Sequence, residues 1–151
     1  MKFQEFSPKA SYTSNEKVSK KFEKFQKLLL QLESKTLPEQ TFSLINSKIQ
    51  EIDSFQNEGD LLLDFLEKKQ QEILRHLQKE LKIVPKGYYR NQWMVVGMSA
   101  FGLPFGVVFG TTLDNMAFIG IGLPMGMAIG IGIGNGMDEK AKKEGRQIDL
   151  D

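Results

Sequence analysis

The sequence has little of the chemistry on which most enzymes and metal proteins depend. Its 151 residues include no cysteine and a single histidine, His76. The absence of cysteine excludes disulfide bonds and thiol chemistry, and one histidine cannot form a metal site or a proton relay alone. No GxGxxG or GxxxxGK phosphate-binding loop is present. We therefore expect no enzymatic activity, no catalytic or metal-binding residues and no cofactor, and we expect His76 to lie at the surface.

An excess of charge of either sign is also absent, since 20 Lys and Arg residues stand against 19 Asp and Glu residues. No basic patch stands out, so we do not expect a nucleic-acid partner. The beginning of the chain, Met1–Phe6, lacks the apolar core of a signal peptide. Any insertion into a membrane would then be directed by an internal segment.

Charge is almost missing from one long stretch, Trp93–Met137, which holds eleven of the fourteen glycines. The runs Trp93–Leu113 and Met116–Met137 contain no ionisable residue, and only Asp114 and Asn115 separate them. At ~1.5 Å per helical residue each run covers roughly 30 Å, the thickness of the hydrocarbon core of a bilayer. We interpret the stretch as two transmembrane helices joined by a minimal turn, with the lipid bilayer as a partner.

The two runs form an internal repeat, because a shift of about twenty residues lays Phe101–Gly106 over Ile121–Gly126. Each copy contains a Leu-Pro pair, and Pro104 and Pro124 would both lie roughly 15 Å deep in the membrane. Proline removes a backbone donor, so we expect a kink at each position. Interrupted helices at the midplane can mark a transporter site, but such sites also carry polar groups, which are missing here. A pair of kinks that helps the helices nest is the favoured interpretation.

Small residues at four-residue spacing predict close packing of these helices. Close backbone approach lets dispersion and Cα–H contacts hold helices together in lipid, where the hydrophobic effect is absent. The second helix carries two such faces about 200° apart, so one can serve the first helix and the other a second copy of the chain. We therefore expect a homo-oligomer. The predicted packing and oligomerisation residues are Gly102, Gly106 and Gly110 on the first helix, Gly122, Gly126, Gly130 and Gly134 on one face of the second, and Gly120, Pro124, Ala128, Gly132 and Gly136 on its other face.

A β interpretation of Ile129–Gly134 is also open, because isoleucine and glycine alternate there. Interior glycine weakens a strand, and a lone hairpin would leave open edges in lipid. A barrel assembled from many chains would escape the second objection.

Before the hairpin, apolar residues recur every three or four positions in three segments. This spacing predicts helices over Glu16–Ser34, Pro38–Gln56 and Leu61–Val84, with Ser14 or Asn15 as the first N-cap. The first helix is rich in lysine, which suits either an anionic membrane surface or the solvated face of a bundle, and we favour the bundle. Short turns between the helices indicate an antiparallel bundle, or a coiled coil that the oligomer completes.

The predicted fold class is therefore all-α, an amphipathic helical bundle or coiled coil followed by a glycine-rich transmembrane hairpin. The apolar stripe of the third helix is interrupted at Lys69, and Phe3 and Phe6 in the loose N-terminal segment could dock on a neighbouring surface. The expected parts are a flexible segment (1–15), a cytoplasmic three-helix domain (16–86), the hairpin (87–137) and a charged tail (138–151).

Aromatic and basic residues mark the ends of the hairpin. Tyr88, Tyr89 and Trp93, with Arg90 among them, are typical of anchors at a lipid–water interface. Cations flank both ends of the hairpin, whereas the turn has none. The positive-inside rule therefore places the hairpin in the cytoplasmic (inner) membrane with both termini in the cytoplasm. The flanking cations are Lys82, Lys86, Arg90, Lys140, Lys142, Lys143 and Arg146.

The glycine spacing in Trp93–Met137 resembles that of the bacterial glycine-zipper proteins with two transmembrane helices. The resemblance implies close helix packing and membrane association, and little about function. Two functions follow from the whole sequence. One is a self-associating scaffold that presents its cytoplasmic helices to a protein partner. The other is an oligomeric pore or membrane-perturbing effector; a pore needs a polar lining or an apolar gate, for which Phe105, Phe109 and Met125 are candidates.

Overall fold

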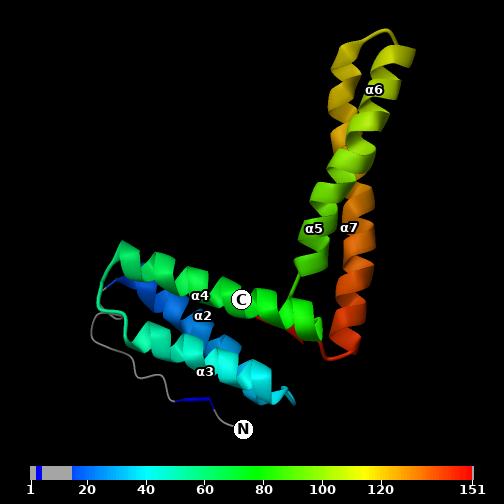
Figure 1. Ribbon diagram of the computed structural model, residues 1–151. Coiled ribbons are helices and arrows are strands. Elements are labelled where there is room, and N and C mark those ends of the chain that lie inside the picture. Colours follow the sequence, from blue (N-terminus) through cyan, green and yellow to red (C-terminus); the bar gives the residue numbers. More distant parts are fainter. Residues whose placement is uncertain (1–2, 5–14, 151) are drawn as a thin grey trace. The chain divides into compact units, whose positions relative to one another are not determined.

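Three helices in the N-terminal part of the chain bury the apolar faces that their spacing predicts. The computed structural model describes residues 3–4 and 15–150, and it contains α2 (Glu16–Glu33), α3 (Glu39–Asp53) and α4 (Asp60–Leu81). Helix α4 packs against both α2 and α3 (Figure 1). The fully buried side chains of these helices include Phe25, Leu28, Leu32, Ile45, Ile49, Ile52, Leu62, Leu66, Ile73 and Leu77.

Local backbone chemistry sets the ends of these helices. Asn15 is extended (φ −127°), and its side chain accepts a hydrogen bond from a first-turn N–H at 2.9 Å, which identifies the cap of α2. Gly59, at φ 64°, precedes α4, and Lys82, at φ 55°, ends it in the left-handed conformation. Helix α4 therefore stops short of the predicted end, and Val84–Pro85 forms a short strand, β1, that pairs with β2 (Gln147–Ile148).

The chain divides into two compact units at this pair of strands. The N-terminal unit runs to Val84 and includes the residues from Ile148 onward, and the hairpin unit is Pro85–Gln147. Ile148 is fully buried in the core of the N-terminal unit, and the N–H of Asp149 donates to the side-chain oxygen of Gln31 at 2.8 Å. The predicted charged tail is thus shared between the two units instead of forming a part of its own.

Phe3 is docked on the N-terminal unit. Of the predicted flexible segment, the structure describes residues 3–4 and 15, and Phe6 lies outside the described residues. The Phe3 side chain is 7% exposed and stacks on Phe42, with 4.9 Å between the ring centres. Its backbone N–H donates to a carboxylate oxygen of Glu33 at 3.0 Å. The ring therefore extends the apolar core beyond the three helices.

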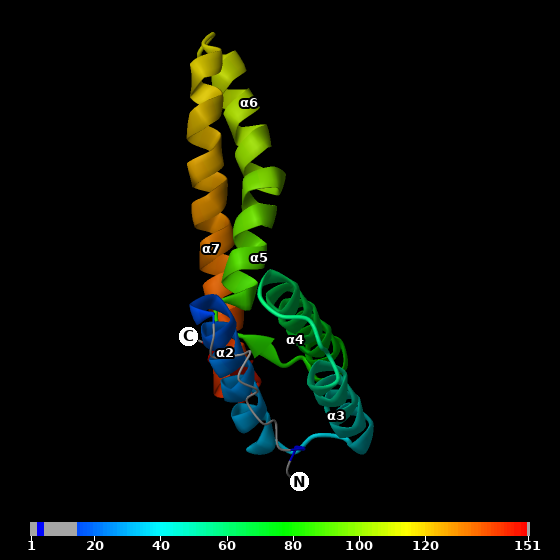
Figure 2. The same cartoon turned by 90° about the vertical axis from the view of Figure 1, so that its left-hand side faces the viewer.

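The hairpin unit consists of two helical runs that lie side by side and antiparallel (Figure 2). The first run is α5 (Tyr88–Gly97), a π-helical turn η1 (Met98–Gly102) and α6 (Leu103–Thr112). The second is a 3₁₀ turn η2 (Met116–Phe118) and α7 (Ile119–Lys143). The predicted all-α class with a helical hairpin is confirmed. The β alternative is wrong, because Ile129–Gly134 lies inside α7.

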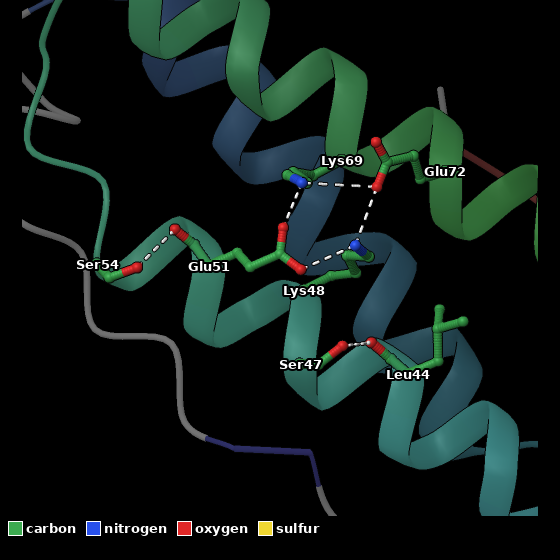
Figure 3. A network of polar contacts seen from close by, with 7 residues as sticks. All are labelled: Leu44, Ser47, Lys48, Glu51, Ser54, Lys69 and Glu72. Atoms are coloured by element: carbon green, nitrogen blue, oxygen red, sulfur yellow. Dashed lines mark hydrogen bonds and ion pairs between the residues drawn. The ribbon is translucent and has the colours of Figure 1, made fainter.

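The interruption of the α4 stripe at Lys69 is explained by a four-residue ionic cluster between α3 and α4 (Figure 3). The Lys69 side chain is 10% exposed; its ammonium group contacts Glu51 and lies 3.6 Å from Glu72. Lys48 contacts the same two carboxylates at 2.8 and 3.1 Å. The Lys69 ammonium also lies 5.0 Å from the centre of the Phe65 ring. Each charge in the cluster therefore has two partners of opposite sign, which makes the burial of a lysine tolerable.

The cluster shifts the pKa values of its members. The hydrogen bond from Lys48, followed by that from Lys69, lowers the pKa of Glu51 below its usual 4.5. The hydrogen bond from Lys48 likewise lowers the pKa of Glu72. In return, the hydrogen bond to Glu51 raises the pKa of Lys48. The charged forms of all three groups are therefore favoured in the folded chain.

This pattern predicts an acid-sensitive contact between α3 and α4. The pKa values of Glu51 and Glu72 are lower in the folded than in the unfolded chain. The two carboxylates therefore contribute fully to the stability of the folded chain above about pH 4.5, and this stabilisation is lost as the pH falls through their folded-state pKa values. Partial exposure limits the effect to about 1 kcal/mol in total. Hydrogen exchange of α3 and α4 amides, corrected for intrinsic rates, should show protection that falls on acidification and does so less steeply in E51Q/E72Q.

The double variant E23Q/E80Q is a matched control, because both glutamates are exposed on the N-terminal unit. It removes the same charge and should keep the wild-type pH dependence. An E51Q/E72Q protein with the wild-type pH dependence would show that the cluster does not stabilise the α3–α4 contact.

Candidate functional site

The hairpin unit exposes most of its large apolar side chains. Tyr88–Thr112 and Met116–Lys143, with 25 and 28 residues, are long and apolar enough to cross a membrane. In the most apolar 18-residue stretch of each segment, only 22% and 17% of the residues are buried. Among the described residues, every exposed large apolar side chain except Leu30 and Leu61 belongs to this unit. They include Val95, Phe101, Leu103, Phe105, Val107, Val108, Phe109, Leu113, Met116, Ile121, Met125, Ile129, Ile133 and Met137.

The turn between the two runs lies where the sequence places it. Asp114 adopts the left-handed conformation (φ 50°). The N–H of Asn115 donates to the carbonyl of Gly110 at 2.9 Å, and its side-chain oxygen accepts from the N–H of Ala117 at 3.0 Å. One residue thus closes the first run and caps the second.

The interior of the hairpin is made of backbone. Gly122, Gly126, Gly130 and Gly134 are buried on the face of α7 that contacts the first run. A methyl group at any of the four would lie within 3.0 Å of backbone atoms of that run, a distance that real side chains essentially never show. We call these residues the buried glycine face. The predicted partners on the first run, Gly102, Gly106 and Gly110, are buried as well and contact the second run.

Gly97 belongs to the same contact, although the four-residue spacing did not predict it. A methyl group at Gly97 would meet the backbone of Gly126 and Gly130. Gly97 precedes Gly102 by five residues, so the four-residue pattern does not reach it. The π-helical turn η1 supplies the extra residue, since the N–H of Leu103 donates to the carbonyl of Met98, five residues earlier.

The two predicted kinks differ in the structure. The π-helical turn immediately precedes Pro104, which lacks the N–H that an α-helical bond would need there. At Pro124 the chain stays α-helical, and α7 continues on both sides of it. The two Leu-Pro pairs are therefore not structurally equivalent.

The opposite side of α7 is open. Gly120, Pro124, Ala128, Gly132 and Gly136 are all exposed. No described atom beyond the chain's immediate neighbours lies within 4 Å of a methyl group placed at Gly120, Gly132 or Gly136. We call these five residues the open small-residue face. It has no packing partner within the hairpin unit.

Asp138 is a second residue that the sequence analysis did not assign. It is 8% exposed, and its two carboxylate oxygens accept hydrogen bonds from the N–H groups of Tyr89 and Arg90, at 3.2 and 3.0 Å. The first N–H groups of a helix have no partner inside it, and the partial positive charge there favours a carboxylate. Asp138 follows Gly134 by four residues, so it continues the buried glycine face and caps α5 from the neighbouring helix.

The predicted interface anchors occupy the first turns of α5. Tyr88, Tyr89 and Trp93 are half-buried, and Arg90 is exposed. The two tyrosine rings meet edge to face with 5.2 Å between centres.

Two hydroxyl side chains on the first run bond to their own helix. The hydroxyl of Ser99 donates to the carbonyls of Val95 and Val96, each at 3.1 Å. The hydroxyl of Thr111 reaches Val107 in the same way, at 2.9 Å. These donors are satisfied without solvent.

Side chains that could hold a metal ion do not gather in the described part of the chain. Residues 3–4 and 15–150 contain no group of three or more metal-ligating side chains. His76 is half-buried, in contrast to the expected surface position, and its Nε2 lies 3.2 Å from the hydroxyl of the buried Thr41. This contact is a structural one between α3 and α4.

The buried and open faces of α7 predict opposite responses to the same substitution. Gly130→Ala places a methyl group against the Trp93 backbone and should destabilise the hairpin by about 1–3 kcal/mol. Gly132→Ala meets open space and should leave the hairpin as stable or more stable, since alanine favours helix by up to about 1 kcal/mol. Thermal unfolding in mild detergent, followed by Trp93 fluorescence, measures both. Equal midpoints would contradict the assignment of the two faces.

The Asp138 cap predicts a local effect at the start of α5. Asp138→Ala should lower the protection of that helix by about 1 kcal/mol, the usual effect of losing an N-cap. Hydrogen exchange at Tyr89 and Arg90 should then be roughly fivefold faster, with little change around Gly106. Glu139→Ala, at the adjacent exposed position, is the control. Faster exchange in the control alone would locate the cap elsewhere.

No family model, curated protein or solved structure matches the chain.

Proposed function

We propose that this chain is an integral membrane protein whose hairpin spans the bilayer. The observation that carries the proposal is the location of the exposed apolar side chains, which surround the hairpin because its interior is backbone. Such a surface is unstable in water and matches the hydrocarbon of a membrane. Two helical runs of 25 and 28 residues are sufficient to cross it.

Charge and aromatic residues support an orientation for the hairpin. The cations at its base, among them Lys86, Arg90 and Lys142, stand on the side away from the turn, which has Asp114 as its only charge. Tyr88, Tyr89 and Trp93 lie at the same end, where an aromatic belt is expected. We therefore propose that both termini are cytoplasmic and that the membrane is the cytoplasmic one.

The open small-residue face supports self-association. Its residues repeat at the spacing of the buried glycine face, which already packs against a helix in this chain. In lipid, a helix face without bulky side chains gains dispersion when a second backbone approaches it. We propose that this face contacts α7 of a second copy, as the likeness to glycine-zipper proteins also implies.

Self-association would gather several N-terminal units at one membrane surface. That unit has its own apolar core and an ionic cluster, so it can act as a folded interaction module. We propose a scaffold that presents these helices to a cytoplasmic protein partner. The pore alternative has less support, since the hydroxyls of Ser99 and Thr111 bond to their own helix and supply no lining.

The mass of the purified protein in mild detergent, corrected for bound detergent, tests self-association. We expect a discrete oligomer for the wild type and a monomer for Gly132→Leu, whose side chain fills the open face. Val107→Leu, an equally apolar change on an exposed part of α6, should keep the oligomer. A monomeric wild type would rule out the assembly.

Dye-loaded vesicles separate the scaffold from the pore. A scaffold leaves the dye inside at protein densities that give the full oligomer. Dye release that is lost with Gly132→Leu would favour the pore instead.

A further inference from the structure

A small charged cavity lies at the base of the hairpin, between the start of α5 and the end of α7. Its volume is about 280 Å³. This lies just below the range of roughly 300–1,000 Å³ for pockets that hold drug-sized molecules, so it suits a compact group. On the α7 side the lining residues recur every three or four positions and therefore share one face. The residues that matter to its chemistry are Lys86, Gly87, Arg90, Asn135, Glu139 and Lys142.

The balance of charge in the cavity favours an anion. Asp138 borders it, but both oxygens of that carboxylate already accept N–H groups of α5. Asp138 and Glu139 together give the lining two carboxylates against three cations, Lys86, Arg90 and Lys142, so the lining has one net positive charge. Arg90 of α5 and Lys142 of α7 therefore bring two cations from different helices to the same small space, and Lys86 lies just before α5.

The start of α5 holds the arginine against the cavity wall. Gly87 has φ 74°, and a methyl group placed on it would lie 3.4 Å from a terminal nitrogen of Arg90. The guanidinium group therefore lies over the Gly87 backbone. Its side-chain contact is with the neighbouring amide of Asn91, whose oxygen lies 3.4 Å from two of its nitrogens. A neutral amide leaves the positive charge of the guanidinium uncompensated.

The cavity lies at the level of the aromatic anchors. Arg90 stands between Tyr89 and Trp93 along α5, and its Cα is in contact with Gly134 of α7. Tyrosine and tryptophan are enriched at the depth of lipid headgroups. In a membrane-spanning hairpin, the cavity would therefore open where the phosphates of the adjacent leaflet are found.

We propose that this cavity binds the phosphodiester group of an anionic phospholipid, held by Arg90 and Lys142 with Lys86 at its edge. The planar donors of arginine match two phosphate oxygens, and the lysine ammonium supplies a point charge. Basic pockets beside transmembrane helices are suited to such headgroups. The inference rests on the proposed membrane insertion of the hairpin.

Trp93, the only tryptophan of the chain, lies three residues after Arg90 on α5 and is a native probe for lipid at this end of the hairpin. The full-length protein is reconstituted in phosphatidylcholine vesicles that contain a minor fraction of phosphatidylglycerol. In one series the phosphatidylglycerol carries brominated acyl chains, which quench tryptophan on contact, and in the other an equal amount of phosphatidylcholine is brominated. The ratio of quenching in the two series measures the preference for the anionic lipid.

We expect brominated phosphatidylglycerol to quench Trp93 more strongly than brominated phosphatidylcholine. In R90Q/K142Q the preference should fall by at least about fivefold, the effect expected for losing one or more cations near a headgroup. K142Q alone, which leaves the α5 backbone contacts untouched, should show a smaller loss in the same direction. The matched control R75Q/K140Q removes an arginine and a lysine outside the cavity and should keep the wild-type ratio.

Other results would overturn the site. An unchanged preference in R90Q/K142Q, or an equal loss in R75Q/K140Q, would reduce the effect to general surface charge. Inorganic phosphate that abolishes the preference at millimolar concentration would assign the cavity to a soluble anion. Absence of quenching in vesicles made wholly of brominated phosphatidylcholine would show that the hairpin does not insert, which refutes the proposed function itself. Quenching there without any anionic preference refutes the lipid site alone.

Discussion

The close approach of two helix backbones along the buried glycine face is the constraint on which the hairpin depends. Helices that pack through side chains stand roughly 8–10 Å apart, and the space between them holds the apolar residues. Here Gly122, Gly126, Gly130 and Gly134 leave no room for even a methyl group. The large apolar side chains of both runs are therefore directed outward. The exposed apolar surface is thus a consequence of the glycine interior and not a separate feature.

The helices of the N-terminal unit pack through large apolar side chains instead of through backbone. These helices place phenylalanine, leucine and isoleucine inside and charged residues outside, as helices in water do. The mean hydropathy of the chain, -0.30, averages over these two patterns and describes neither. Lys69 is a charged residue inside this unit, but it enters the α3–α4 contact together with two carboxylates that compensate its charge. The pattern of apolar residues changes at Pro85, where the proposed membrane protein passes from a unit surrounded by water to one surrounded by lipid.

Much of the hairpin packing was predictable, because residues three or four positions apart lie on the same face of a regular helix. The four-residue series from Gly122 to Gly134 and the turn at Asp114 follow from that geometry alone. Glu72 lies three residues after Lys69 on the same helix, so that contact follows from the spacing, but the contact with Glu51 was not predictable because Glu51 lies on another helix. Asp138 was missed for a different reason. Its charge placed it with the tail, although its position, four residues after Gly134, continues the buried face.

Gly97 shows why spacing fails where the helix itself changes. Five residues of regular α-helix would turn Gly97 about 140° away from Gly102 and out of the contact. The π-helical turn Met98–Gly102 takes up the additional residue, so that both glycines face Gly126. The contact thereby continues past Pro104 towards the base of the hairpin.

That continuation brings the start of α5 against the end of α7. Gly134 lies against the backbone of Tyr89 and Arg90, and only at this separation can the next residue of the series reach the unpaired N–H groups of α5. A side chain larger than hydrogen at Gly134 would hold the helices apart and leave those groups unsatisfied. The carboxylate of Asp138 is therefore the natural end of the buried glycine face. The continuous approach of two backbones therefore depends on four features together: the π-helical turn, Gly97, Gly134 and the cap at Asp138.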